Sequence, residues 1–204
     1  MGLCALCLSM VGCGGSTSER TTQTSDPAPR PALDLSFHWT NPSAELTTSD
    51  ATFVRAFMES MQSIVLSGNS ADGYPGFDRV NNGVWISQDD TPQNPQYRNV
   101  YMNILRIEHP YGSTAQAAVC LWMGSEGFHG FPTHLSYTQR GTSPPTDQAG
   151  PEKRPRADVF GDWRISRVDE DSNEDWETCG KLKPADIAPP DAAIAPVPGW
   201  PAAK

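Results

Sequence analysis

The sequence predicts an α+β domain in which a long N-terminal helix packs on a curved antiparallel sheet. Two observations predict this class. Apolar residues recur with the helical period between Thr47 and Gly68, and segments with a period of two follow this helix. A helix followed by a run of strands is typical of α+β domains. Residues 45–182 form the predicted domain, between a flexible tether over 13–44 and a disordered, Pro/Ala-rich tail over 183–204.

The stretch TTSDATFVRAFMESMQSIVLSG carries the signals of one continuous helix. Thr48 or Ser49 can cap its first turn, and Gly68 can end it. A turn-rich stretch follows, with one helical turn predicted over Pro75–Val80 and a short strand over Val84–Ser87. Residues spaced three and four apart predict that one face of the long helix enters the core: Val54, Phe57, Met58, Met61 and Val65.

Two long strands are predicted next, joined as a hairpin by HPYGS. The first is QYRNVYMNILRIEHP and the second is TAQAAVCLWMGSEG, both rich in β-branched and aromatic residues. A short strand over Thr133–Tyr137 and a closing strand over Asp162–Val168 complete the predicted sheet. The first strand is expected to place Val100, Met102 and Ile104 on one face and Tyr101, Asn103, Leu105 and Ile107 on the other.

The charge balance argues against a nucleic-acid partner. Acidic residues outnumber basic ones by 24 to 15, giving a net charge of −9. Proteins that bind nucleic acid depend on clustered Lys and Arg. The short basic cluster EKRPR (Glu152–Arg156) is interpreted as a loop. No run of 18 or more apolar residues follows the start, so no membrane-spanning segment is predicted there.

An apolar stretch, GLCALCLSMVGC, ends at Cys13 and gives way to a Ser/Thr/Gly/Pro-rich segment. The sequence Met10-Val11-Gly12-Cys13 resembles a bacterial lipobox, although Met10 replaces the usual Leu and no Lys or Arg precedes the apolar stretch. The resemblance implies that residues 1–12 are a signal-like leader, that Cys13 is lipidated, and that the protein is anchored on the extracytoplasmic face of the cell membrane. The alternative is an ordinary hydrophobic leader with incidental cysteines.

The cysteine count then favours one disulfide in the domain. Without the leader cysteines and Cys13, only Cys120 and Cys179 remain. Two thiols in an exported domain are candidates for a disulfide, and the alternative is a pair of buried free thiols. The closed loop would span about 59 residues, for which the chain-entropy model gives about 4 kcal/mol. Neither cysteine has a second one at short spacing, so no metal site is expected there.

The order of elements also resembles a known family. A long helix, the turn region GYPGF, a long hairpin and a closing GDWRISRVDE strand are similar to the cone-shaped fold of nuclear transport factor and ketosteroid isomerase, also called SnoaL-like. The lipobox, tether and two-cysteine domain resemble lipoproteins of mycobacteria and other actinobacteria. The family resemblance covers about residues 45–182 and implies a cavity inside the cone. Some relatives catalyse proton transfer there, others bind ligands, and many only mediate contacts.

Isomerase-type chemistry would need a carboxylate base and hydroxyl donors for an oxyanion. Asp72 and Asp78 are the candidate carboxylates, although turn formation explains both better. The candidate donors are Tyr97, Tyr101 and Tyr137.

Two further groups of residues suggest a metal site and a serine nucleophile. His129 and His134 with Glu126 could hold a metal, but surface loop histidines explain them better. The segment MGSEG lacks the first glycine of a nucleophile elbow and has no evident His and acid partners. No catalytic residue, metal or cofactor is therefore predicted. Aromatic residues are mostly expected in the core, with a minority lining an apolar pocket: Trp85, Trp122, Trp163, Trp176, Phe128 and Phe131.

The sequence thus predicts a cell-envelope lipoprotein whose domain is a non-catalytic binding or interaction module. Its expected partners are the membrane, through the lipid anchor, and either a hydrophobic small molecule or another envelope protein. The alternative is a small-molecule isomerase or hydrolase that uses the cone pocket.

Overall fold

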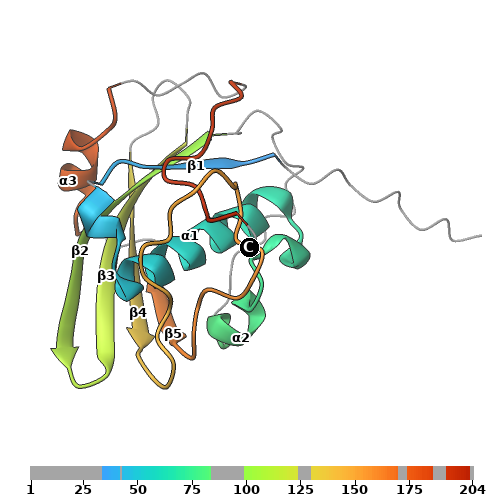
Figure 1. Ribbon diagram of the computed structural model, residues 1–204. Coiled ribbons are helices and arrows are strands. Elements are labelled where there is room, and N and C mark those ends of the chain that lie inside the picture. The colour runs from blue at the N-terminus through green and yellow to red at the C-terminus, as the bar shows by residue number, and fades with distance from the viewer. Residues whose placement is uncertain are drawn as a thin grey trace, which may run out of the picture. The chain divides into compact units, whose positions relative to one another are not determined.

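The computed structural model describes residues 34–41, 43–83, 99–123, 130–169, 174–185 and 192–202 (Figure 1). The predicted strand over Val84–Ser87 and the leader, Cys13 and most of the tether lie outside these residues. The elements are, in chain order, β1 (Ser36–Trp39), η1 (Ser43–Leu46), α1 (Ser49–Ser67), η2 (Ser70–Asp72), α2 (Phe77–Asn81), β2 (Asn99–Tyr111), β3 (Thr114–Met123), β4 (Phe131–Thr138), β5 (Arg164–Asp169) and α3 (Trp176–Lys181).

The predicted fold class is wrong. The described residues form mainly a mixed sheet of five strands in the order β1-β2-β3-β4-β5, and α1 is their only helix longer than six residues. Strands β2 to β5 pair antiparallel, but β1 runs parallel to β2, with Ser36 opposite Asn99 and Trp39 opposite Met102. An antiparallel sheet carrying one long helix is therefore not what the chain builds.

Strand β1 was missed because it falls in the stretch assigned to the tether. It has only four residues and follows a Pro-rich segment. The sequence does carry one signal for this strand, because apolar residues occupy every second position. These residues, Leu35, Phe37 and Trp39, all enter the main core. Ser36 and His38 lie between them and are buried as well.

The helix predicted between Thr47 and Gly68 is confirmed as α1. The Thr48 side chain accepts a hydrogen bond from the backbone N–H of Ala51, which caps the first turn. Gly68 ends the helix in the left-handed region at φ 61°, and its N–H donates to the carbonyl of Ile64.

The expectation that α1 buries only one face is wrong. Nearly every residue from Ala51 to Ile64 is buried, including the charged Arg55 and Glu59. On one side, Phe53 packs against Tyr137 of β4, with ring centroids 4.8 Å apart. The other side is covered by the long connection between β4 and β5 and by the C-terminal segment, as the two donations of Arg55 to backbone carbonyls of these segments show (Figure 1).

The hairpin of β2 and β3 is confirmed, with one change in the predicted faces. A β-bulge lies between Ile104 and Arg106, so the alternation of β2 shifts by one residue. Ile107 consequently packs against the main core with Val100, although it was expected on the opposite face. The same shift places Arg106 on the sheet face away from α1.

The expectation of a disordered tail is wrong for residues 192–202. Val197 forms a parallel bridge with His38 of β1, and Trp200 forms an antiparallel bridge with Glu152. The Trp200 side chain is 1% exposed, which makes it part of the main core. One buried indole and backbone pairing order a segment that its composition alone would leave unpacked.

Candidate functional site

The sheet face away from α1, here called the open face, carries the candidate site. Ala117 and Val119 of β3 point into the main core. Side chains alternate along a strand, so Ala118, Cys120 and Trp122 point to the open face. Cys120 and Trp122 form a second, smaller buried cluster there with Tyr101 and Cys179. This cluster is the apolar support on which the polar part of the face rests.

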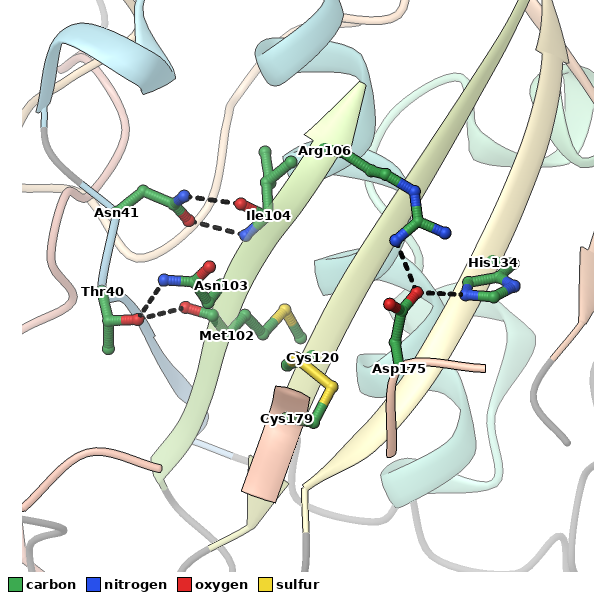
Figure 2. Close-up of a disulfide and its surroundings, with 10 residues drawn as sticks. All are labelled: Thr40, Asn41, Met102, Asn103, Ile104, Arg106, Cys120, His134, Asp175 and Cys179. Carbon is green, nitrogen blue, oxygen red and sulfur yellow. Dashed lines mark hydrogen bonds and ion pairs between the residues drawn. A yellow bond between two sulfur atoms is a disulfide. The ribbon is translucent and has the colours of Figure 1, made fainter. Parts of the chain in front are cut away.

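A disulfide fixes α3 to the open face (Figure 2). Cys120 of β3 is bonded to Cys179 of α3, with the two Cα atoms 5.4 Å apart, so the structure brings the two predicted cysteines together. Both are fully buried. Trp176, the first residue of α3, packs edge-on against Phe131 at 5.2 Å between ring centroids. The disulfide and the ring contact hold a six-residue helix that has little packing of its own.

One turn before Cys179, Asp175 connects α3 to two strands. Its Oδ2 atom accepts a hydrogen bond from Arg106 Nη1 of β2 at 2.6 Å and lies 3.0 Å from His134 Nε2 of β4 (Figure 2). Arg106 also contacts Glu174 through Nη2 at 3.1 Å and Glu108 through Nε at 3.7 Å. Three carboxylates therefore surround one guanidinium, and one of them also orients a histidine.

The backbone of Asp175 is shaped for these contacts rather than for capping α3. Asp175 occupies the N-cap position at φ 70°, a left-handed conformation that is uncommon for residues other than glycine. Its side chain makes no capping hydrogen bond. Burial alone would raise the pKa of Asp175, but the hydrogen bonds from Arg106 and His134 outweigh it and hold that pKa below its usual value. The carboxylate is thus charged at neutral pH.

Asn41 fixes the bulge that turns Arg106 toward the site. The Asn41 side chain accepts from the backbone N–H of Ile104 at 2.6 Å and donates to the Ile104 carbonyl at 2.8 Å (Figure 2). This amide pairs with β2 as one further residue of β1 would. The bulge begins at Ile104, so the position of Arg106 depends on this contact.

A cavity of about 320 Å³ opens beside the Asp175 cluster. Ala118 is the reason for the hollow, because it carries only a methyl group between Arg106 and His134 on the neighbouring strands. Polar and charged side chains dominate the lining, which includes Glu108, Gln116, Ser136, Arg167, Asp169 and Glu174. The surroundings suit a ligand with hydrogen-bonding and charged groups.

The residues predicted for isomerase-type catalysis do not form this site. Asp72 ends η2 in a half-buried position, and Asp78 is exposed in the first turn of α2. Tyr101 packs beside the disulfide. The Tyr137 hydroxyl donates to Asp50 at 2.6 Å, so the structure pairs it with a carboxylate other than the two predicted ones. Burial, together with the Asp50 carboxylate, raises the pKa of Tyr137.

Several other predicted residues lie outside the described part of the chain: Cys13, Trp85, Tyr97, Glu126, Phe128 and His129. Among the described residues, Trp122 and Trp163 are buried and Phe131 contacts Trp176. Lining of an apolar pocket by aromatic residues remains a prediction. His134, considered for a metal, instead contacts Asp175, and the described residues contain no group of three or more His, Cys, Asp or Glu arranged to hold a metal ion.

Sequence reasoning missed Arg106 and Asp175. One signal for Asp175 was available, since a residue four positions before Cys179 must lie near Cys120 once the disulfide is assumed. Arg106 gave no such signal, because its face depends on the bulge.

Comparisons of the chain with family models, with curated proteins and with solved structures find no match. The resemblance to the cone-fold family remains a prediction. No helix in the described ranges combines the length and apolarity needed to cross a bilayer.

Proposed function

We propose that this protein is an envelope lipoprotein, anchored through Cys13. Its domain binds a polar partner in the cavity of about 320 Å³ on its open face, called the groove below. The observation that carries the proposal is the buried Cys120–Cys179 disulfide, which fastens α3 to the open face beside the groove, where Glu174 just before this helix is part of the lining. Intramolecular disulfides persist in exported proteins and are rare in the cytosol, which agrees with a leader that ends at Cys13.

The groove itself supports binding rather than catalysis. All three nitrogens of Arg106 have carboxylate neighbours, so its guanidinium shapes the wall and is not poised over a reacting atom. Gln116 is exposed and Ser136 half-buried in the same lining, where both can exchange hydrogen bonds with an incoming polar group. A polar segment of another envelope protein is the partner that this lining fits best.

Site-specific photocrosslinking in the cell envelope tests the proposal. A photoreactive residue at Gln116 should give a crosslinked product of discrete mass, because this position lies in the groove. The same residue at Glu177, which is 85% exposed on α3, serves as the control and should not give it. The Gln116 product should disappear in an Arg106→Ala background. Identical products from both positions, or a product unaffected by Arg106→Ala, would contradict the proposal.

A second candidate function is hydrolysis or isomerisation of a small molecule, and the His134–Asp175 contact favours it. A charged carboxylate that orients an imidazole is a common arrangement for a general base. Turnover of a panel of model esters and enolisable ketones would then vanish in His134→Ala. The variant His109→Ala, at a half-exposed histidine near the hairpin end, is the control. If the unmodified protein turns over none of these compounds, hydrolysis and isomerisation are ruled out as its function.

A further inference from the structure

The C-terminal segment, residues 192–202, lies against β1, α1 and residues 150–152, which form a surface here called the tail-binding surface. Val197 is the point of contact with β1: its N–H donates to the Phe37 carbonyl at 3.0 Å, and its carbonyl accepts from the N–H of Trp39. Trp200 and Glu152 exchange two backbone hydrogen bonds, at 2.7 and 3.0 Å. The segment is thus paired through its backbone on two sides, as a peptide added to a sheet edge is.

One side chain anchors this segment. Trp200 is 1% exposed, whereas Val197 is 56% exposed, so the indole is the main side-chain contact near the bridge to β1. Its Nε1 donates to Glu59 Oε2 at 2.7 Å, its ring lies 4.5 Å from the Arg55 guanidinium carbon, and Tyr74 packs edge-on at 5.8 Å. The contacts match an interface in which a single aromatic residue supplies most of the binding energy.

Two buried charges on α1 contact this segment. Arg55 donates to the carbonyls of Pro198 at 3.0 Å and Gly199 at 3.4 Å, and it is fully buried. Glu59 is also buried and receives the Trp200 indole. A buried ion pair is often less stabilising than apolar residues of the same volume, so its presence points to recognition rather than to stability.

We propose that the tail-binding surface is a peptide-recognition site for an extended Pro-Gly-Trp segment, and that it can take this segment from a second copy of the chain. Within one chain the site is filled by Pro198, Gly199 and Trp200. Covalent connection gives this segment an effective concentration in the millimolar range, so exchange between copies becomes visible only at comparable protein concentrations or after the connection is cut. This inference does not depend on the anchor at Cys13 or on the open face.

The first test uses the full chain with a protease site introduced within 186–191, cut after folding. The cut protein should exchange its own segment for a fluorescent peptide of residues 192–204, read as a rise in anisotropy. Peptide carrying Trp200→Ala should compete at least about 30-fold more weakly than the unmodified peptide. Ile194→Ala is the matched control and should compete as well as the unmodified peptide, because its side chain is exposed. Equal competition by the Trp200→Ala peptide overturns the proposal, as does failure of the labelled peptide to bind a cut protein whose circular dichroism is unchanged.

The second test needs no cut and applies even if the cut protein unfolds. The full chain is unfolded, refolded at millimolar concentration, diluted and examined by size-exclusion chromatography with light scattering. Exchange predicts a dimer fraction that grows with the refolding concentration and is at least about tenfold smaller in Trp200→Ala. Refolding that gives only monomer at every concentration overturns exchange between copies.

Discussion

At the scale of single residues, the interior of this domain is more polar than its sequence pattern indicates. Glu59 is 1% exposed, and it accepts hydrogen bonds from three side chains besides its ion pair with Arg55. Burial raises the pKa of Glu59, while Arg55 and the three donors act in the opposite direction. Such a network is satisfied only when every member is present.

We expect Glu59→Ala to destabilise the domain by about 3–5 kcal/mol, because it leaves the buried Arg55 charge without its carboxylate. The control is the double variant Arg55→Met/Glu59→Ala, which removes both charges and should lose less than the sum of the single changes Arg55→Met and Glu59→Ala by at least about 1 kcal/mol. Urea unfolding of the four proteins measures these differences. Strict additivity would show that the two charges do not act as a pair.

A second residue-scale prediction concerns pH. Burial lowers the pKa of His38 from the ordinary value of 6.5, and the Asn99 hydrogen bond only partly offsets it. The folded protein therefore binds this proton more weakly than the unfolded chain does. Stability should be fully present above pH 6.5 and should fall as the pH drops through that value toward the lower pKa of the folded state.

Urea unfolding at pH 7.5 and pH 5.5 tests this dependence. The loss of stability between these two values should shrink in His38→Gln, which keeps a hydrogen-bonding group near Asn99. The same loss in His38→Gln as in the unmodified protein would show that His38 is not the titrating group.

At the scale of elements, local signals could be read from the sequence and long-range ones could not. The caps and apolar spacing of α1 and the alternation of β2 and β3 are local, and the structure confirms these elements. The parallel pairing of β1 with β2 joins residues about 60 positions apart, and no local pattern encodes it. The covering of the outer side of α1 by loops is a tertiary effect of the same kind.

In the candidate site, too, local features could be predicted from the sequence and long-range ones could not. The cysteine count pointed to Cys120 and Cys179, but the Arg106–Asp175–His134 cluster depends on a bulge in β2 and on a left-handed residue before α3. Neither feature has a sequence signal strong enough to identify it in one chain. The indole of Trp200 was hidden in the same way by its Pro/Ala-rich surroundings.

Removing the disulfide should loosen α3 before the rest of the domain. We expect Cys120→Ala/Cys179→Ala to cost about 4 kcal/mol for a loop of 59 residues. Hydrogen exchange should accelerate most in α3 and at Asp175, and the contact of Asp175 with His134 should weaken. Uniform acceleration across the sheet and α3 would show that the disulfide does not act as a local clamp.

Asn41→Ala should disturb the open face from a distance. The variant removes two hydrogen bonds to the Ile104 backbone and should cost about 1–3 kcal/mol. Because Ile104 begins the bulge, NMR shifts of Arg106 and Asp175 should change as well. Asn103→Ala, whose side chain bonds Thr40 outside this contact, is the control. Unchanged NMR shifts of Arg106 and Asp175 in Asn41→Ala would show that the bulge does not position these two residues.

At the scale of the whole molecule, the proposed anchor at Cys13 lies outside the described residues, and the described domain begins at Asp34. The link between the two is chemical, because the same oxidising compartment that receives a lipidated chain also allows Cys120 and Cys179 to form their bond.

Intact-mass spectrometry of the protein extracted from membranes and treated with a thiol-alkylating reagent is the sharpest test of lipidation at Cys13 and of the disulfide. We expect a chain that begins at Cys13, carries the added mass of a diacylglyceryl group, and has no alkylated cysteine. A chain that still begins at Met1, with both Cys120 and Cys179 alkylated, would contradict both.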